Sequence, residues 1–131
     1  MKKLIALALV LVCALGMVSC SSGMNFNIAT ASKIELRYGG DGTTIEITDE
    51  EDIKYITDNI NALKFSKGES SKNSSGWNYS LKWYDSGNNL IEEIVVMSKN
   101  QIAYKNYFYT TMDADSEIDI FFLGAFFGMD D

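Results

Sequence analysis

Short segments in which apolar and polar residues alternate dominate the chain from residue 33 onward. Ile34, Leu36 and Tyr38 alternate with charged residues, and the pattern returns at residues 43–47 after the glycine-rich residues 39–42. Successive side chains of a strand point to opposite faces, so a period of two indicates a strand with one buried face. Two such strands joined by a tight turn predict a β-hairpin.

Further alternating segments follow in the second half of the chain. They cover residues 77–84, 90–97, 101–104 and 107–112, and short sequences rich in Asn, Gly, Ser and Lys join them. Strands connected in this way form an antiparallel meander. The polar residues 66–76, which precede the first of them, are expected to form a surface loop.

Two segments have the period of a helix. The first begins at the capping-box pattern Thr48-x-x-Glu51 and has one apolar stripe over about fifteen residues, formed by Ile53, Ile56, Ile60 and Leu63. The second is predicted over Glu117–Phe127, with Ser116-x-x-Asp119 as its cap.

These segments predict an α+β domain with the order ββαββββα. The most economical packing is a single antiparallel β-sheet, made of the hairpin and the four-strand meander, with both helices packed on one face. The helix, four strands and helix at 48–127 resemble the TATA-binding-protein-like topology. That resemblance implies a fold and carries no function.

The first twenty residues have the pattern of an export signal. Lys2 and Lys3 precede an uncharged stretch, Leu4–Val18, which is shorter than the roughly twenty residues that span a bilayer. Met17-Val18-Ser19-Cys20 closes the stretch and resembles the lipobox of bacterial lipoproteins. The resemblance implies that the Cys20 thiol receives a diacylglyceryl group and becomes the new N-terminus. An ordinary cleaved secretory signal and an uncleaved anchor are the alternatives.

On this interpretation the chain has three parts. Residues 1–19 are a removable signal peptide, residues 20–32 are the lipidated cysteine and a flexible tether, and residues 33–131 are the folded domain. Phe26 and Ile28 leave one alternative open, because the alternating sequence Asn-Phe-Asn-Ile is also compatible with an edge strand. Residues 33–110 also resemble small uncharacterised lipoproteins of Gram-positive bacteria related to the Clostridia, which supports the location and implies no activity.

The charge and the cysteine count exclude several classes of function. Without Lys2 and Lys3 the chain keeps 9 basic and 18 acidic residues, a net charge of −9. This balance opposes binding to nucleic acid, which depends on basic side chains that neutralise phosphates. Cys13 leaves with the signal and lipid occupies Cys20, so no thiol remains for a disulfide or a zinc site.

Residues 113–119 contain four carboxylates and raise the question of a calcium site. An EF-hand loop needs Gly at its sixth position and Glu at its twelfth, and this chain has Ile118 and Gly124 there. Carboxylates that compensate a helix dipole are the expected interpretation, and an irregular divalent-ion site is the alternative. We therefore predict neither a metal nor a cofactor.

The chain offers little for catalysis. It contains no His, which excludes Ser-His-Asp and Cys-His arrangements and His-ligated metals. Trp77, Tyr79 and Trp83 share one strand face and could stack on a sugar, but a core role is expected from their spacing. A carboxylate pair of the glycosidase type is the remaining enzymatic alternative. The chain is not expected to be an enzyme.

Together these features predict a lipid-anchored, non-enzymatic binding or adaptor domain on the extracytoplasmic face of a bacterial cell membrane. Its partners would be the membrane, through the lipid on Cys20, and an envelope protein or extracellular ligand. The alternative is an inhibitor or immunity-type protein against an envelope hydrolase or toxin, since a small acidic domain suits a basic cleft.

The predicted last helix is apolar on two sides. One stripe is assigned to the sheet and consists of Ile118, Phe121, Phe122, Ala125 and Phe126. The opposite stripe is Ile120, Leu123 and Phe127, which we list as a possible contact surface for a partner. Burial of this second stripe beneath a loop or the tether is the alternative.

Overall fold

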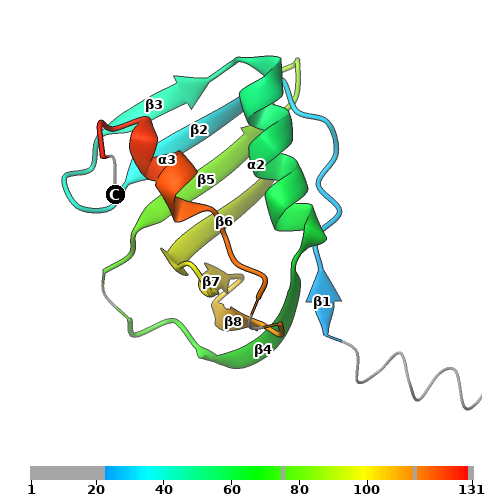
Figure 1. Ribbon diagram of the computed structural model, residues 1–131, viewed down its shortest axis with the longest axis vertical. Coiled ribbons are helices and arrows are strands. Elements are labelled where there is room, and N and C mark those ends of the chain that lie inside the picture. The colour runs from blue at the N-terminus through cyan, green and yellow to red at the C-terminus, as the bar shows by residue number, and fades with distance from the viewer. Residues whose placement is uncertain (1–22, 75, 114, 130–131) are drawn as a thin grey trace, which may run out of the picture.

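The computed structural model describes residues 23–74, 76–113 and 115–129, and within them it contains one open eight-stranded antiparallel sheet and two helices (Figure 1). The α+β class with a single antiparallel sheet is confirmed. The elements are β1 (Met24–Asn25), β2 (Lys33–Tyr38), β3 (Thr44–Ile47), α2 (Glu50–Ala62), β4 (Lys64–Ser70), β5 (Tyr79–Tyr84), β6 (Leu90–Ser98), β7 (Gln101–Tyr104), β8 (Tyr107–Thr111) and α3 (Ile120–Ala125).

The strands lie in the order β1-β4-β8-β7-β6-β5-β2-β3. β2 and β3 form a hairpin in which Ile34 lies opposite Ile47, and β5 to β8 pair consecutively as a meander. β2 joins the two groups by pairing with β5, where Leu36 lies opposite Leu81. These inward positions are buried, as expected from the alternation.

The predicted loop at 66–76 is wrong in its first part, because β4 occupies Lys64–Ser70 and pairs with β8. Phe65 is the buried side chain of this strand, and the residues after it are exposed. A strand that contributes one inward apolar residue has no period of two in its sequence. The polar composition of residues 66–70 therefore gave no indication of a strand.

The predicted tether at 20–32 is also wrong over its described part. Met24 and Asn25 form the edge strand β1 beside β4, and Phe26 and Ile28 are buried in the core. The Asn61 side chain holds this segment through two hydrogen bonds with the backbone of Ile28, of 2.9 and 3.1 Å. The edge-strand alternative was therefore closer to the structure. Cys20 lies outside the described residues.

Both helices begin later than predicted. Asp49, not Thr48, caps α2 and accepts a hydrogen bond from the Asp52 amide at 3.0 Å. Asp119 caps α3 and accepts from the Phe122 amide at 3.0 Å, so the cap expected at Ser116 is wrong. α3 is consequently six residues long, and residues 116–119 before it have no regular secondary structure.

The helices pack on the core through β5. The indole N–H of Trp83 donates to the Thr57 hydroxyl of α2 at 2.9 Å, and both residues are buried. Gly124 of α3 lies against the Tyr79 hydroxyl, so close that a Cβ there would be 3.0 Å from this oxygen. In Figure 1, α2 and α3 lie side by side in front of the sheet, and the Tyr55 hydroxyl of α2 donates to Asp119 at the start of α3.

Candidate functional site

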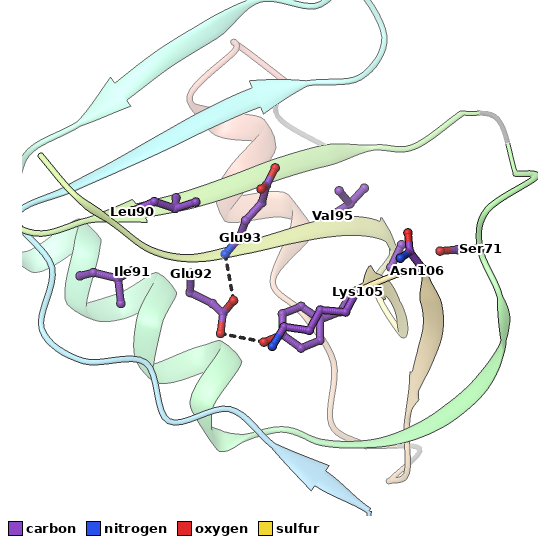
Figure 2. Close-up of a pocket in the computed structure, with 10 residues that line it drawn as sticks. Ser71, Leu90, Ile91, Glu92, Glu93, Val95, Lys105 and Asn106 are labelled. Carbon is purple, nitrogen blue, oxygen red and sulfur yellow. Dashed lines mark hydrogen bonds between the residues drawn. The ribbon is translucent and has the colours of Figure 1, made fainter.

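A cavity of about 470 Å³ opens beside the first half of β6 (Figure 2). It exists because β6 has nine residues and its neighbour β7 has four. The pairs between them run from Val95↔Ala103 to Ser98↔Gln101, so β6 extends beyond β7 at its beginning. The cavity is lined by Ser71, Leu90, Ile91, Glu92, Glu93, Val95, Ala103, Tyr104, Lys105 and Asn106.

Glu92 is the central polar group of this cavity. Its carboxylate accepts a hydrogen bond from the Tyr104 hydroxyl at 3.0 Å and another from the backbone N–H of Glu93 at 3.1 Å. Figure 2 shows Glu92 and Glu93 on opposite sides of β6, with the Glu92 carboxylate directed toward the end of β7.

Tyr104 joins the cavity to the core. Its ring makes an edge contact with Phe26 at a centroid distance of 4.9 Å. Burial raises the pKa of the Tyr104 hydroxyl, the hydrogen bond to Glu92 raises it further, and Lys105 acts in the opposite direction. The phenol is therefore neutral at physiological pH and serves as a hydrogen-bond donor.

The turn between β7 and β8 supplies the basic group of the cavity. Lys105 and Asn106 have positive φ angles of 48° and 73°, as a type I′ turn requires at both central positions. This geometry leaves the Lys105 ammonium 5.1 Å from the centre of the Tyr104 ring. A carboxylate, a phenol and an ammonium group are thereby gathered at one end of the cavity.

Apolar surface lies next to these polar groups. Leu90 is 53% exposed, and Ile91 is half-buried and packs on the core. Exposed apolar side chains beside a few converging polar groups are typical of binding sites. The arrangement can bind a partner that carries both apolar and charged groups.

A second hollow of about 270 Å³ adjoins this cavity, because Glu93 and Val95 line both. Here the Arg37 guanidinium lies 5.7 Å from the centre of the Trp77 ring, and Lys82 forms an ion pair with Glu93 at 3.9 Å. The two hollows form one continuous surface across the middle of the sheet.

A third hollow, of about 580 Å³, lies between residues 28–32 and α2. Four of its polar side chains already have partners within the fold. Asn61 binds the backbone of Ile28, Lys54 pairs with Asp58, and Thr57 accepts from Trp83. We assign this hollow to the packing of residues 28–32 on the helix.

The predicted contact stripe does not form one surface. Leu123 is buried, with 2% of its surface exposed, while Ile120 and Phe127 are half-buried and pack on the core. Phe121, which was assigned to the sheet, is 59% exposed. The assignment of faces is wrong because Ile118 precedes the helix. Its amide donates to the Lys99 carbonyl at 2.7 Å, so it cannot be projected onto the same wheel as α3.

The carboxylates at 113–119 are used separately. Asp113 accepts from the Asp115 amide at 3.0 Å, Glu117 pairs with Lys99 at 3.6 Å, and Asp119 caps α3. Within 23–74, 76–113 and 115–129, no group of three or more acidic, Cys or His side chains is placed to hold a metal ion.

The aromatic residues predicted on one strand face divide into two groups. Tyr79 and Trp83 are buried in the core, which excludes them from a sugar-stacking surface. Trp77 precedes β5, is half-buried and contacts Arg37. The core interpretation therefore holds for the two residues that lie within the strand.

Sequence reasoning missed Glu92, Tyr104 and Lys105 as a group. One signal could have indicated Glu92. Ile94 and Val96 are inward residues of β6, and counting back by two places a carboxylate on the inward side. An inward carboxylate needs a hydrogen-bonding partner. The identity of that partner depends on the short length of β7 and could not be read from the pattern.

Comparisons with protein-family models, with curated proteins and with solved structures gave no match. The part of the chain that the structure describes contains no helix with the length and apolar character needed to cross a membrane.

Proposed function

We propose that this chain is a lipid-anchored, non-enzymatic binding domain on the outer face of a bacterial membrane, and that the cavity beside β6 contacts an envelope protein or extracellular ligand. The main support for this proposal is the cavity, which is lined by exposed Leu90 together with Glu92, Tyr104 and Lys105. The resemblance of Met17-Val18-Ser19-Cys20 to a lipobox supports attachment to the membrane.

The state of the polar groups favours binding over catalysis. The Glu92 carboxylate already accepts two hydrogen bonds, from Tyr104 and from the Glu93 amide. A raised pKa keeps the Tyr104 phenol protonated at physiological pH, so the phenolate form that could act as a base is absent there. Fixed donors and acceptors of this kind give a binding surface its orientation and specificity.

The proposal also takes both helices to cover the same face of the sheet. Two contacts support this arrangement. Thr57 of α2 meets Trp83, and Gly124 of α3 meets Tyr79. Trp83 and Tyr79 are four residues apart in β5, so their side chains point to the same side of the strand.

The anchor is tested by membrane fractionation and by the intact mass of the purified protein. Cys20→Ser should leave the protein unlipidated and either release it from the membrane fraction or block cleavage. Cys13→Ser is the matched control and should behave like wild type. A mature wild-type protein that starts at another residue, with no added lipid mass, would contradict the anchor.

The cavity is tested by cross-linking in intact envelopes. Leu90→Asp combined with Lys105→Glu should abolish the main cross-linked product, because the substitutions alter the apolar and the basic contacts together. Phe121→Asp is the matched control, since it adds a charge at an exposed apolar residue of α3. Equal loss in both variants would contradict a role for the cavity. A basic hydrolase as the product would support inhibition, and a resident membrane complex would support an adaptor.

A further inference from the structure

The folded domain begins very close to the predicted lipid. Ser21, Ser22 and Gly23 are the residues between Cys20 and β1, which starts at Met24. Even fully extended, this spacing allows at most about 14 Å between the Cα atoms of Cys20 and Met24. The edge of the sheet that contains β1 is therefore held near the lipid headgroups whenever Cys20 is lipidated.

The side chains around β1 suit that position. We define the anchor-side surface as Met24, Lys64, Lys67, Tyr107 and Met112. Met112 is 51% exposed, and its amide donates to the Lys64 carbonyl at 2.9 Å. It also adjoins Gly23 so closely that a Cβ there would collide with the Met112 sulfur. Exposed methionine at this edge can enter the interface between headgroups and acyl chains.

Lys67 and Tyr107 extend this surface along β4, away from β1, because Tyr107 pairs with Ser70 at the other end of the strand. The Lys67 ammonium lies 3.9 Å from the centre of the Tyr107 ring, and Tyr107 is 39% exposed. Tyrosine with an apolar ring and a polar hydroxyl is favoured at membrane interfaces, and lysine is attracted to anionic headgroups. Glu69, Asp113 and Asp115 are also exposed along or next to this edge, so these acids offset the charge of the two lysines.

One group of four acids lies at the other end of α2. Asp49 caps the helix, and Glu50, Glu51 and Asp52 form its first turn. The helix has thirteen residues and is therefore about 20 Å long. Its last residue, Ala62, lies two positions before Lys64 in the anchor-side surface. The four acids are thus separated from the anchor by more than the Debye length of about 8 Å.

From these observations we infer that the anchor-side surface rests on the phospholipid bilayer, with the acidic N-terminus of α2 directed away from it. The inference depends on the proposed lipid anchor. The short chain segment between Cys20 and β1 brings the β1 edge to the lipid. Exposed Met112 at this edge fits the interface, and repulsion between the four acids and anionic headgroups disfavours the inverted orientation. The cavity beside β6 is then presented at the side of a domain of fixed orientation.

The test uses the lipidated protein in vesicles of phosphatidylcholine and phosphatidylglycerol. Met112→Cys and Glu50→Cys each introduce one thiol for a fluorescent label, because the lipidated Cys20 does not react. Lipids with a spin label in the headgroup region should quench the label at residue 112 strongly and the label at residue 50 weakly. A glycine-serine spacer inserted before Gly23 should reduce this difference.

The outcomes separate the orientation from the anchor. Equal quenching at residues 112 and 50 in lipidated, vesicle-bound protein overturns the orientation and leaves the anchor intact. Absence of lipid on Cys20, with protein free of the vesicles, overturns the proposed function and this inference with it. Lys64→Glu with Lys67→Glu should reduce quenching at residue 112, and Lys54→Glu on α2 is the matched control. Equal effects of these variants would show that the lysines do not face the bilayer.

Discussion

Trp83 donates its indole N–H to the Thr57 hydroxyl at 2.9 Å, which joins the centre of the sheet to the middle of α2. The Thr57 hydroxyl itself donates to the Ile53 carbonyl at 2.7 Å. The buried Thr57 hydroxyl therefore accepts a hydrogen bond from the largest side chain of the core and donates one to the backbone of its own helix. The pair fixes the position of α2 along β5.

Thr57→Val should destabilise the domain by about 1–3 kcal/mol, because the indole N–H would stay buried without an acceptor. Urea unfolding followed by tryptophan fluorescence measures the effect. Thr110→Val is the control, since Thr110 is an exposed β8 residue. The same small change in both variants would mean that the hydrogen bond contributes little to stability.

Phe26→Ala should cost about 3–5 kcal/mol, as expected when a large aromatic side chain is removed from a core. Phe26 packs edge-on against Phe65 and Tyr104, at centroid distances of 5.7 and 4.9 Å. Asn27→Ala, at the exposed neighbouring position, should change stability little. Thermal unfolding distinguishes them, and wild-type stability of Phe26→Ala would mean that residues 23–32 are a tether after all.

Leu123→Asp should destabilise the domain by about 4 kcal/mol or more, since it places an unpaired charge in the core. Phe121→Asp should change stability by only about 0.5 kcal/mol, because that side chain is exposed. Calorimetric Tm values for the two variants give the comparison. The reverse order would restore the predicted assignment of the two faces of α3.

Tyr104 should make the stability of the domain fall at alkaline pH. Its pKa is raised above the ordinary value of 10.0, first by burial and then by the hydrogen bond to Glu92. The folded state therefore holds this proton more tightly than the unfolded state does. The resulting stabilisation is complete below pH 10.0 and is lost as the pH rises through the folded pKa.

Urea midpoints measured on both sides of pH 10.0 test this pH dependence. Tyr104→Phe should flatten the alkaline fall, and Glu92→Gln should shift the phenolate absorbance change toward lower pH. A fall in stability of Tyr104→Phe that runs parallel to wild type would assign the effect to other tyrosines, such as Tyr79, whose pKa burial also raises.

The sequence predicts those elements whose buried side chains recur at a regular period. β2 shows this with Ile34 and Leu36, and α2 shows it with Ile53, Ile56 and Ile60. β1 has two residues and β4 has one buried residue, Phe65, so neither has a period to detect. Their place in the sheet is determined by pairing with distant partners, which a local pattern does not contain.

The candidate site was less predictable than the fold. Glu92 stands at an inward position, but its partner Tyr104 reaches it only because β7 ends early. Similarly, the direction of Leu123 depends on where α3 begins, and that start depends on the hydrogen bond from Ile118 to Lys99. Both features come from contacts between segments that are separate in the sequence.

The neighbours of β4 determine when the domain can fold. β4 pairs with β8, where Phe65 lies opposite Thr111, and β1 pairs only with β4. In a chain exported N-terminus first, as we propose for this one, β1 leaves the membrane channel long before β8 does. Phe26 and Phe65 then stay exposed to solvent until nearly the whole domain has been translocated. The distant pairing therefore predicts slow folding, and in an exported chain it predicts a period in which chaperones have access to these two side chains.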